Sequence, residues 1–114
     1  MRNPFRGDIW LIDLNPAKGR EQTGKRPALI ISADGFNKSA AELVVVLPIT
    51  SKKKNIPLHV EVIPPDGGLN ITSYIKCEDI RSVSKERLAD FLGTTSPEVM
   101  NKVEKILKLL LVLD

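Results

Sequence analysis

What most constrains the fold of this chain is the order in which two kinds of apolar pattern occur along its 114 residues. Short apolar or alternating runs of strand type come first, and apolar residues at helical spacing come only near the C-terminus. Strands and helices therefore do not alternate, which argues against a parallel sheet joined by crossover helices. We expect a single domain, residues 1–114, that is mainly β, with an antiparallel sheet arranged as a small barrel and with C-terminal helices.

Five segments are expected to form strands and two to form helices. The strands are residues 7–14, 28–32, 43–50, 58–63 and 73–83. The first helix is expected over residues 85–92, with Ser84 as its N-cap and Gly93 at its end. The second begins at Ser96-Pro97, an N-cap followed by a proline at the first helical position.

The counts of two residue types restrict the chemistry. The single cysteine, Cys77, excludes an internal disulfide and a cysteine-based zinc site, and the single histidine, His59, excludes a paired-histidine mechanism. We therefore expect any enzyme activity to need no metal and no other cofactor. Cys77 lies on the apolar side of an alternating segment and is predicted to be buried. His59 lies on the polar side of its segment and is predicted to face solvent.

The charge and the apolar runs bear on partners and location. A net charge of +3 permits a nucleic-acid or acidic partner without requiring one. Residues 1–6 hold no apolar run of the signal-peptide kind, and the runs 43–47 and 109–113 are far too short to span a membrane. These features predict a cytoplasmic protein without a membrane partner. The run 109–113 is expected to be buried against the barrel or a partner.

Several short motifs lie in order along nearly the whole chain. They are GDIW (7–10), DLNP (13–16), GREQ (19–22), Arg26-Pro27, LPITS (47–51), PLHV (57–60), CEDIRSV (77–83) and KERL (85–88). Together these motifs resemble the MazF/PemK toxin family. Each motif alone is a weak signal, and their shared order is specific. The connection 33–42 and the turn 64–70 match the family pattern poorly.

The resemblance implies the toxin of a type II toxin–antitoxin pair, with an SH3-like antiparallel β-barrel of the CcdB/PemK type. Such a toxin is a homodimer and a metal-independent, sequence-specific endoribonuclease (an mRNA interferase) that cuts single-stranded RNA. Its cognate antitoxin places an acidic tail in the RNA groove. The family's active arginine falls on Arg26 and its active threonine on Thr50. The glutamate and glutamine of its first loop fall on Glu21 and Gln22.

Metal-free RNA cleavage uses the neighbouring 2′-hydroxyl as nucleophile and leaves a 2′,3′-cyclic phosphate and a 5′-hydroxyl. It needs a proton acceptor, a proton donor and positive charge near the phosphorane. The planar donors of Arg26 suit phosphate oxygens, and a guanidinium holds its proton too tightly to be a good base. We therefore assign Arg26 to transition-state stabilisation. Thr50 is expected to bond a phosphate oxygen, Ser51 to assist, and Glu21 is the nearest candidate base.

Basic residues gather in the two segments that flank the proposed site. They are Lys18, Arg20 and Lys25 in the first loop, and Lys52, Lys53 and Lys54 after Thr50. We expect these residues to follow the RNA backbone, and the same groove suits an acidic antitoxin tail. Few aromatic side chains are present for base stacking, and Phe36 and Tyr74 are the ones expected to be exposed.

Two other functions remain open at the level of the sequence. A CcdB-like gyrase poison would share the barrel without cutting RNA, and an SH3-like module would bind a peptide in its groove. The presence of Arg26 together with Thr50 favours the endoribonuclease, because a gyrase poison does not need this pair.

Overall fold

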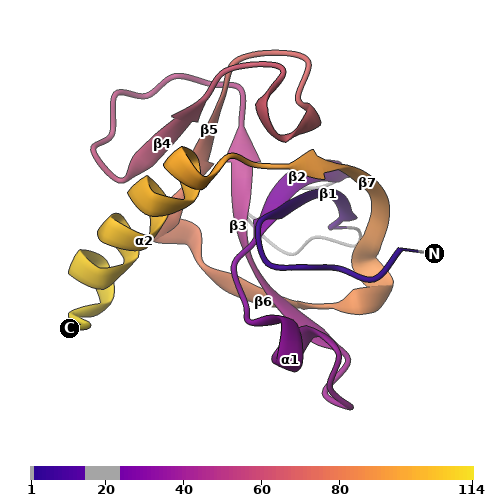
Figure 1. Cartoon of the computed structure of the whole chain (residues 1–114). Coiled ribbons are helices and arrows are strands. Elements are labelled where there is room, and N and C mark those ends of the chain that lie inside the picture. Colours follow the sequence, from indigo (N-terminus) through magenta and orange to yellow (C-terminus); the bar gives the residue numbers. More distant parts are fainter. Residues whose placement is uncertain (1, 15–23) are drawn as a thin grey trace.

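A strongly curved antiparallel sheet with one long helix beside it forms the body of the protein (Figure 1). The computed structural model describes residues 2–14 and 24–114. The strands are β1 (Asp8–Asp13), β2 (Lys25–Ile30), β3 (Leu43–Thr50), β4 (His59–Val62), β5 (Ser73–Lys76), β6 (Arg81–Ser84) and β7 (Leu88–Thr94). The helices are α1 (Asp34–Asn37) and α2 (Pro97–Leu111), with 3-10 turns η1 (Asp66–Gly68), η2 (Cys77–Asp79) and η3 (Lys85–Arg87).

The strands follow the order β4-β5-β3-β2-β1-β7, and β6 also pairs with β3. The long strand β3 serves two partners along one edge: Val44 lies opposite Val83 of β6, and Thr50 lies opposite Tyr74 of β5. The mainly β, antiparallel fold with a C-terminal helix is confirmed. Within residues 2–14 and 24–114, the end strands β4 and β7 do not pair with each other, so the expected barrel is open rather than closed.

Alternation along the strands sends apolar side chains into two cores on opposite faces of the sheet. One core joins β1–β5 to α2, and Ile9, Leu29 and Val103 are fully buried in it. The other core is built around Trp10 and Ile12. Burying one large apolar side chain contributes about 1.5–3 kcal/mol to the stability of the fold. The two cores together therefore hold the curved strands that carry the site in place.

The helix expected over residues 85–92 is absent, and this prediction is wrong. Ser84 does act as a cap, since its hydroxyl accepts a hydrogen bond from the Glu86 amide at 3.2 Å. The cap starts only the turn η3, after which the chain enters β7 and pairs with β1, Trp10 opposite Phe91. Strand pairing and burial along β1 override the local helix signal. The expected strand 73–83 is likewise divided into β5 and β6 by η2.

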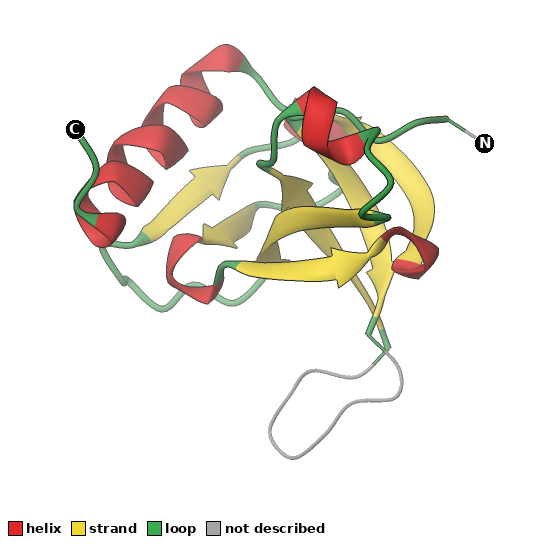
Figure 2. Ribbon diagram, turned by 90° about the horizontal axis from the view of Figure 1, so that it is seen from below, coloured by secondary structure: helices red, strands yellow, loops and turns green. Residues whose placement is uncertain are grey.

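The second predicted helix is confirmed as α2, which lies along one side of the sheet (Figure 2). Its N-cap is Ser96, whose hydroxyl accepts a hydrogen bond from the Val99 amide at 3.3 Å. The C-terminal apolar run is not buried against the sheet, since Leu109 is 80% exposed and Leu113 is 58% exposed. No helix in the part of the chain that the structure describes is long and apolar enough to cross a membrane.

Candidate nucleic-acid cleavage site

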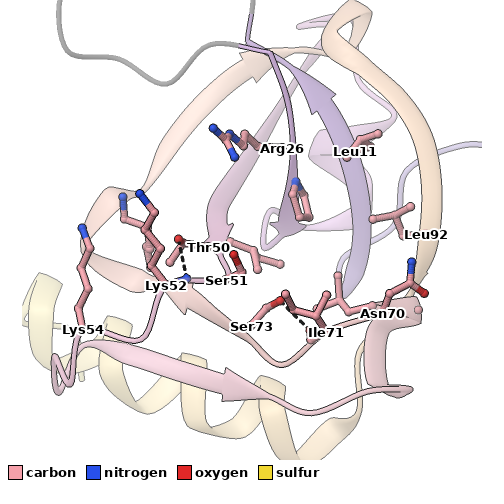
Figure 3. Close-up of a pocket in the computed structure, with 15 residues that line it drawn as sticks. Leu11, Arg26, Thr50, Ser51, Lys52, Lys54, Asn70, Ile71, Ser73 and Leu92 are labelled. Atoms are coloured by element: carbon pink, nitrogen blue, oxygen red, sulfur yellow. Dashed lines mark hydrogen bonds between the residues drawn. The ribbon is translucent and has the colours of Figure 1, made fainter.

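A cleft of about 470 Å³ opens where β2 begins and β3 ends, facing the segment that follows η1 (Figure 3). Its lining is Leu11, Arg26, Pro27, Ile49, Thr50, Ser51, Lys52, Lys54, Gly68, Leu69, Asn70, Ile71, Ser73, Lys76 and Leu92. Three of the residues named from the sequence as catalytic or assisting are in this set: Arg26, Thr50 and Ser51. The fold therefore brings Arg26 to the two hydroxyl residues from a distant part of the chain.

The register of β2 against β3 brings Arg26 to Thr50. The β2–β3 pairing ends with Ala28 opposite Pro48, and Arg26 and Thr50 each lie two residues beyond this pair on their strands. Both side chains line the cleft, as Figure 3 shows.

This rim of the cleft is cationic. Lys52 and Lys54 line it beside Arg26, and Lys76 of β5 adds a fourth positive group. Lys76 also lies 3.6 Å from Asp79, so its charge is partly compensated. Arg26 is exposed and forms no salt bridge with any residue of the ranges 2–14 and 24–114. Its donors are thus free of those residues and available to an anion.

The hydroxyl of Thr50 is oriented by a hydrogen bond from the loop that follows β3. Its Oγ1 accepts a hydrogen bond from the Lys52 amide at 3.2 Å, which leaves the hydroxyl proton free to be donated. Thr50 is half-buried, while Ser51 beside it is exposed. The hydroxyl can therefore donate to a phosphate oxygen that approaches along the cationic rim.

The opposite rim of the cleft is mainly apolar and was not found by the sequence analysis. Figure 3 shows Leu11, Leu92, Asn70 and Ile71 on this side. Ile71 is 55% exposed, so its apolar side chain is accessible to a ligand in the cleft. The only sequence signal for this rim is the turn 64–70, whose poor match to the family pattern draws attention to it. The apolar surface can pack against the faces of nucleobases.

The other residues that the sequence placed at the site do not line the cleft or lie outside the described residues, and one lysine of the lining was not predicted. Lys53 points to a neighbouring hollow rather than into the cleft, and Lys25 is exposed on β2 but does not line the cleft. Four further predictions lie outside the described residues: Lys18, Arg20, Glu21 and Gln22. Lys76 was missed, although its place between the buried residues Ile75 and Cys77 indicates an outward side chain.

The side chain of His59 is buried, so the prediction that it faces solvent is wrong. It is only 4% exposed, and its Nε2 lies 2.9 Å from Oε2 of Glu78. Burial alone would raise the pKa of Glu78, but hydrogen bonds from His59 and the backbone, together with the charges of His59 and Lys76, outweigh it and the pKa lies below its ordinary value. The buried thiol of Cys77 has its pKa raised to about 11 by desolvation and by the charge of Glu78.

Comparison of the whole chain with known proteins agrees with the geometry of the site. The sequence profile of the PemK-like, MazF-like toxins of type II toxin–antitoxin systems matches residues 5–111. This chain belongs to that family. Endoribonuclease EndoA of Bacillus subtilis is 37% identical over 109 residues, which cover 95% of this chain and 94% of the relative. Endoribonuclease MazF9 of Mycobacterium tuberculosis is 36% identical, over 91% and 92% of the two chains.

Solved structures of PemK/MazF toxins share the fold of this chain. A mycobacterial endoribonuclease in complex with its cognate antitoxin is 31% identical, covers 100% of this chain and 98% of its own, and superposes with a TM-score of 0.80. MazF of Deinococcus radiodurans is 27% identical, covers 98% and 99%, and gives a TM-score of 0.84. The antiparallel sheet of this chain, with its C-terminal helix, is therefore a MazF-like fold.

Proposed function

We propose that this chain is the toxin of a toxin–antitoxin pair and cuts single-stranded RNA at specific sequences, without a metal ion. The observation that carries the proposal is that Arg26 and Thr50 line one cleft together with Lys52, Lys54 and Lys76. The names of the relatives, both endoribonucleases, support it.

The proposed reaction is an internal transfer at one phosphate of the RNA. The 2′-oxygen bonds to phosphorus, the bond from phosphorus to the 5′-oxygen breaks, and a 2′,3′-cyclic phosphate and a 5′-hydroxyl result. Arg26 stabilises the added negative charge of the phosphorane, and the Thr50 hydroxyl donates to a phosphate oxygen. A base takes the 2′-proton and an acid protonates the 5′-oxygen. Glu21 is our candidate base, and Gln22 and Ser51 are candidates to assist.

The two rims of the cleft have separate tasks in this proposal. Lys52, Lys54 and Lys76 attract the phosphates on one side. Leu11, Ile71 and the other apolar residues on the opposite side pack against the bases. Lys18, Arg20, Lys25 and Lys53 extend the positive field around the cleft.

The family also supplies proposals about assembly. A cognate antitoxin would inhibit by laying an acidic tail along the cationic rim, which carries the complementary charge. We further propose that the toxin is a cytoplasmic homodimer and that its open sheet belongs to the SH3-like class.

Cleavage of RNA by purified protein in EDTA tests this function. We expect Arg26→Ala to lower the rate about 100-fold or more, since removing one charge-stabilising donor commonly has that effect. Thr50→Val, which keeps the shape and removes the hydroxyl, should lower it about tenfold or more. Lys105→Ala, an exposed change on α2, is the matched control and should cut at the wild-type rate. Circular dichroism checks that each variant folds.

Two further arms separate the alternatives. A single 2′-deoxy nucleotide at the cut position should abolish cleavage, because it removes the nucleophile. A wild-type protein that cuts no RNA would contradict the proposal. Growth arrest with intact RNA and inhibited supercoiling would then indicate a gyrase poison, and the absence of any toxicity would indicate a peptide-binding module.

A further inference from the structure

A second, smaller hollow lies next to the cleft, on the far side of the lysine segment. It measures about 250 Å³ and is lined by Lys53, Lys54, Asn55, Ile56, His59, Glu61 and Tyr74. Lys54 lines both spaces, so the cationic rim of the cleft leads directly into the hollow. The volume lies below the roughly 300 Å³ at which pockets for whole small molecules begin. It suits a single ring that belongs to a longer ligand.

Strand register connects this hollow to the proposed cleavage residues. Thr50 of β3 lies opposite Tyr74 of β5, and Tyr74 lies opposite Glu61 of β4. These three side chains form one row across β3, β5 and β4 on the same face of the sheet. Arg26 lines the cleft together with Thr50, at the end of this row. A strand of RNA held by Arg26 and Thr50 can follow this row into the hollow.

The walls of the hollow carry the groups that recognise a nucleobase. Tyr74 is half-buried and offers an aromatic ring for stacking. Its hydroxyl donates to Glu61 Oε2 at 3.4 Å, which is longer than the usual distance of about 2.7–2.8 Å and is therefore a weak bond. Among the described residues Glu61 forms no salt bridge, so its exposed carboxylate is available to a ligand.

The floor of the hollow is fixed by the buried histidine. His59 pairs with Glu78 through Nε2, and the His59 amide donates to the Ile56 carbonyl at 2.9 Å. The first bond joins β4 to η2, and the second ties the segment after Lys54 to β4. The hollow is thus part of the folded body of the protein.

We infer that this hollow is a nucleobase subsite for the RNA flanking the cut, in which Tyr74 stacks on one base and Glu61 reads its edge. The inference rests on the proposed function. A carboxylate only accepts hydrogen bonds, so it favours the exocyclic amino groups of adenine, cytosine and guanine. Uracil has no exocyclic amino group, and its one ring donor, N3–H, lies between two carbonyl oxygens that the carboxylate repels. The subsite therefore discriminates against uracil at one flanking position.

The test is cleavage of a randomised single-stranded RNA, followed by sequencing of the product ends. We expect the wild type to disfavour uracil at one flanking position. Glu61→Gln keeps the shape and adds an amide donor for uracil carbonyls, so it should raise the relative cleavage of uracil-bearing RNA roughly tenfold at that position alone. Glu98→Gln on α2, across the sheet from the hollow, makes the same charge change and should keep the wild-type preference.

Tyr74 gives a second, independent readout based on RNA length. Tyr74→Ala should lower kcat/KM roughly tenfold for RNAs long enough to reach the hollow and leave short RNAs unaffected. Lys105→Ala on α2 is the control and should keep the wild-type rate for RNAs of every length. A uniform loss for all lengths and sequences, or unchanged base preferences in Glu61→Gln, would overturn the subsite while the cleavage function stands. Altered antitoxin affinity with unchanged base preference would overturn it in favour of a protein contact.

One result would contradict the proposed function itself. If the wild type cuts no member of the RNA pool, the proposed function fails and the subsite fails with it. Failure of the function can be distinguished from failure of the subsite alone. If only the subsite fails, the wild type still cuts RNA, and the variants show whether the subsite exists.

Discussion

Two neighbouring residues of η2 have pKa values shifted in opposite directions, because one side chain points into the core and the other points to the surface. Cys77 is fully buried, and its pKa is raised to about 11. Glu78 reaches the surface and pairs with His59, and its pKa lies below the ordinary value. At this scale, alternation in the sequence identified the burial of Cys77 correctly. It placed His59 on the correct side of β4 but gave no sign that residues 51–58 cover that side.

The thiol of Cys77 is expected to be unreactive in the folded protein. Burial removes access, and a pKa of about 11 leaves very little thiolate at pH 8. We expect negligible labelling by a thiol reagent such as iodoacetamide at pH 8. Labelling should be complete once concentrated guanidinium chloride has unfolded the chain and exposed the thiol. Rapid labelling of the native protein would show that η2 opens readily.

The His59–Glu78 pair should make stability depend on pH in the acid range. A carboxyl whose folded-state pKa is lowered stabilises the fold above its ordinary value of 4.5 and loses that contribution as pH falls through the lower folded value. We expect the difference in unfolding free energy between wild type and Glu78→Gln to shrink from pH 5 to pH 3. Urea titrations at each pH measure it. A constant difference would contradict the pairing.

Whether a capped segment becomes a helix or a strand depends on tertiary contacts that no local sequence pattern encodes. Ser84 is a functional cap, yet the segment after it becomes β7 because β1 offers it a pairing edge. Ser96 is a cap of the same kind, and α2 follows as predicted, because its apolar face has the core around Val103 to pack on. The two segments therefore differ in the part of the fold that they contact, and not in their caps.

The contact between η1 and β7 depends on glycine. Gly68 has a φ of +72°, and a Cβ there would lie 1.9 Å from the Leu92 carbonyl oxygen. We expect Gly68→Ala to lower the free energy of unfolding by about 2 kcal/mol or more, from strain and overpacking together. Gly35→Ala is the matched control, because a Cβ at Gly35 meets nothing within 4 Å and alanine favours the helix α1. Chemical denaturation measures both, and equal stabilities would contradict the close approach.

At the scale of the whole molecule, the end of α2 leaves an apolar surface uncovered. Leu109 and Leu113 are 80% and 58% exposed, and Val112 between them is 88% exposed. An exposed patch of this kind usually marks an interaction surface. The proposed homodimer offers a partner for it.

Substitution at the end of α2 tests that role. We expect the wild type to sediment as a dimer and the double variant Leu109→Lys/Leu113→Lys to shift toward the monomer, because charges would replace buried apolar surface. Both side chains are exposed in the single chain, so the variant should fold. Lys105→Ala on the same helix is the control. A double variant that remains fully dimeric would place the dimer contact on another face.

Patterns within the chain were sufficient to predict the antiparallel, mainly β class, the extent of β3, the start of α2 and the family. These depend on alternation, caps and ordered motifs, which are local properties of the sequence. The tertiary structure alone decided that the sheet stays open, that residues 88–94 form a strand, and that Lys76 and the apolar rim join Arg26 and Thr50 at one cleft. Register between distant strands sets those contacts, and register results from the packing of the whole core, which no single segment encodes.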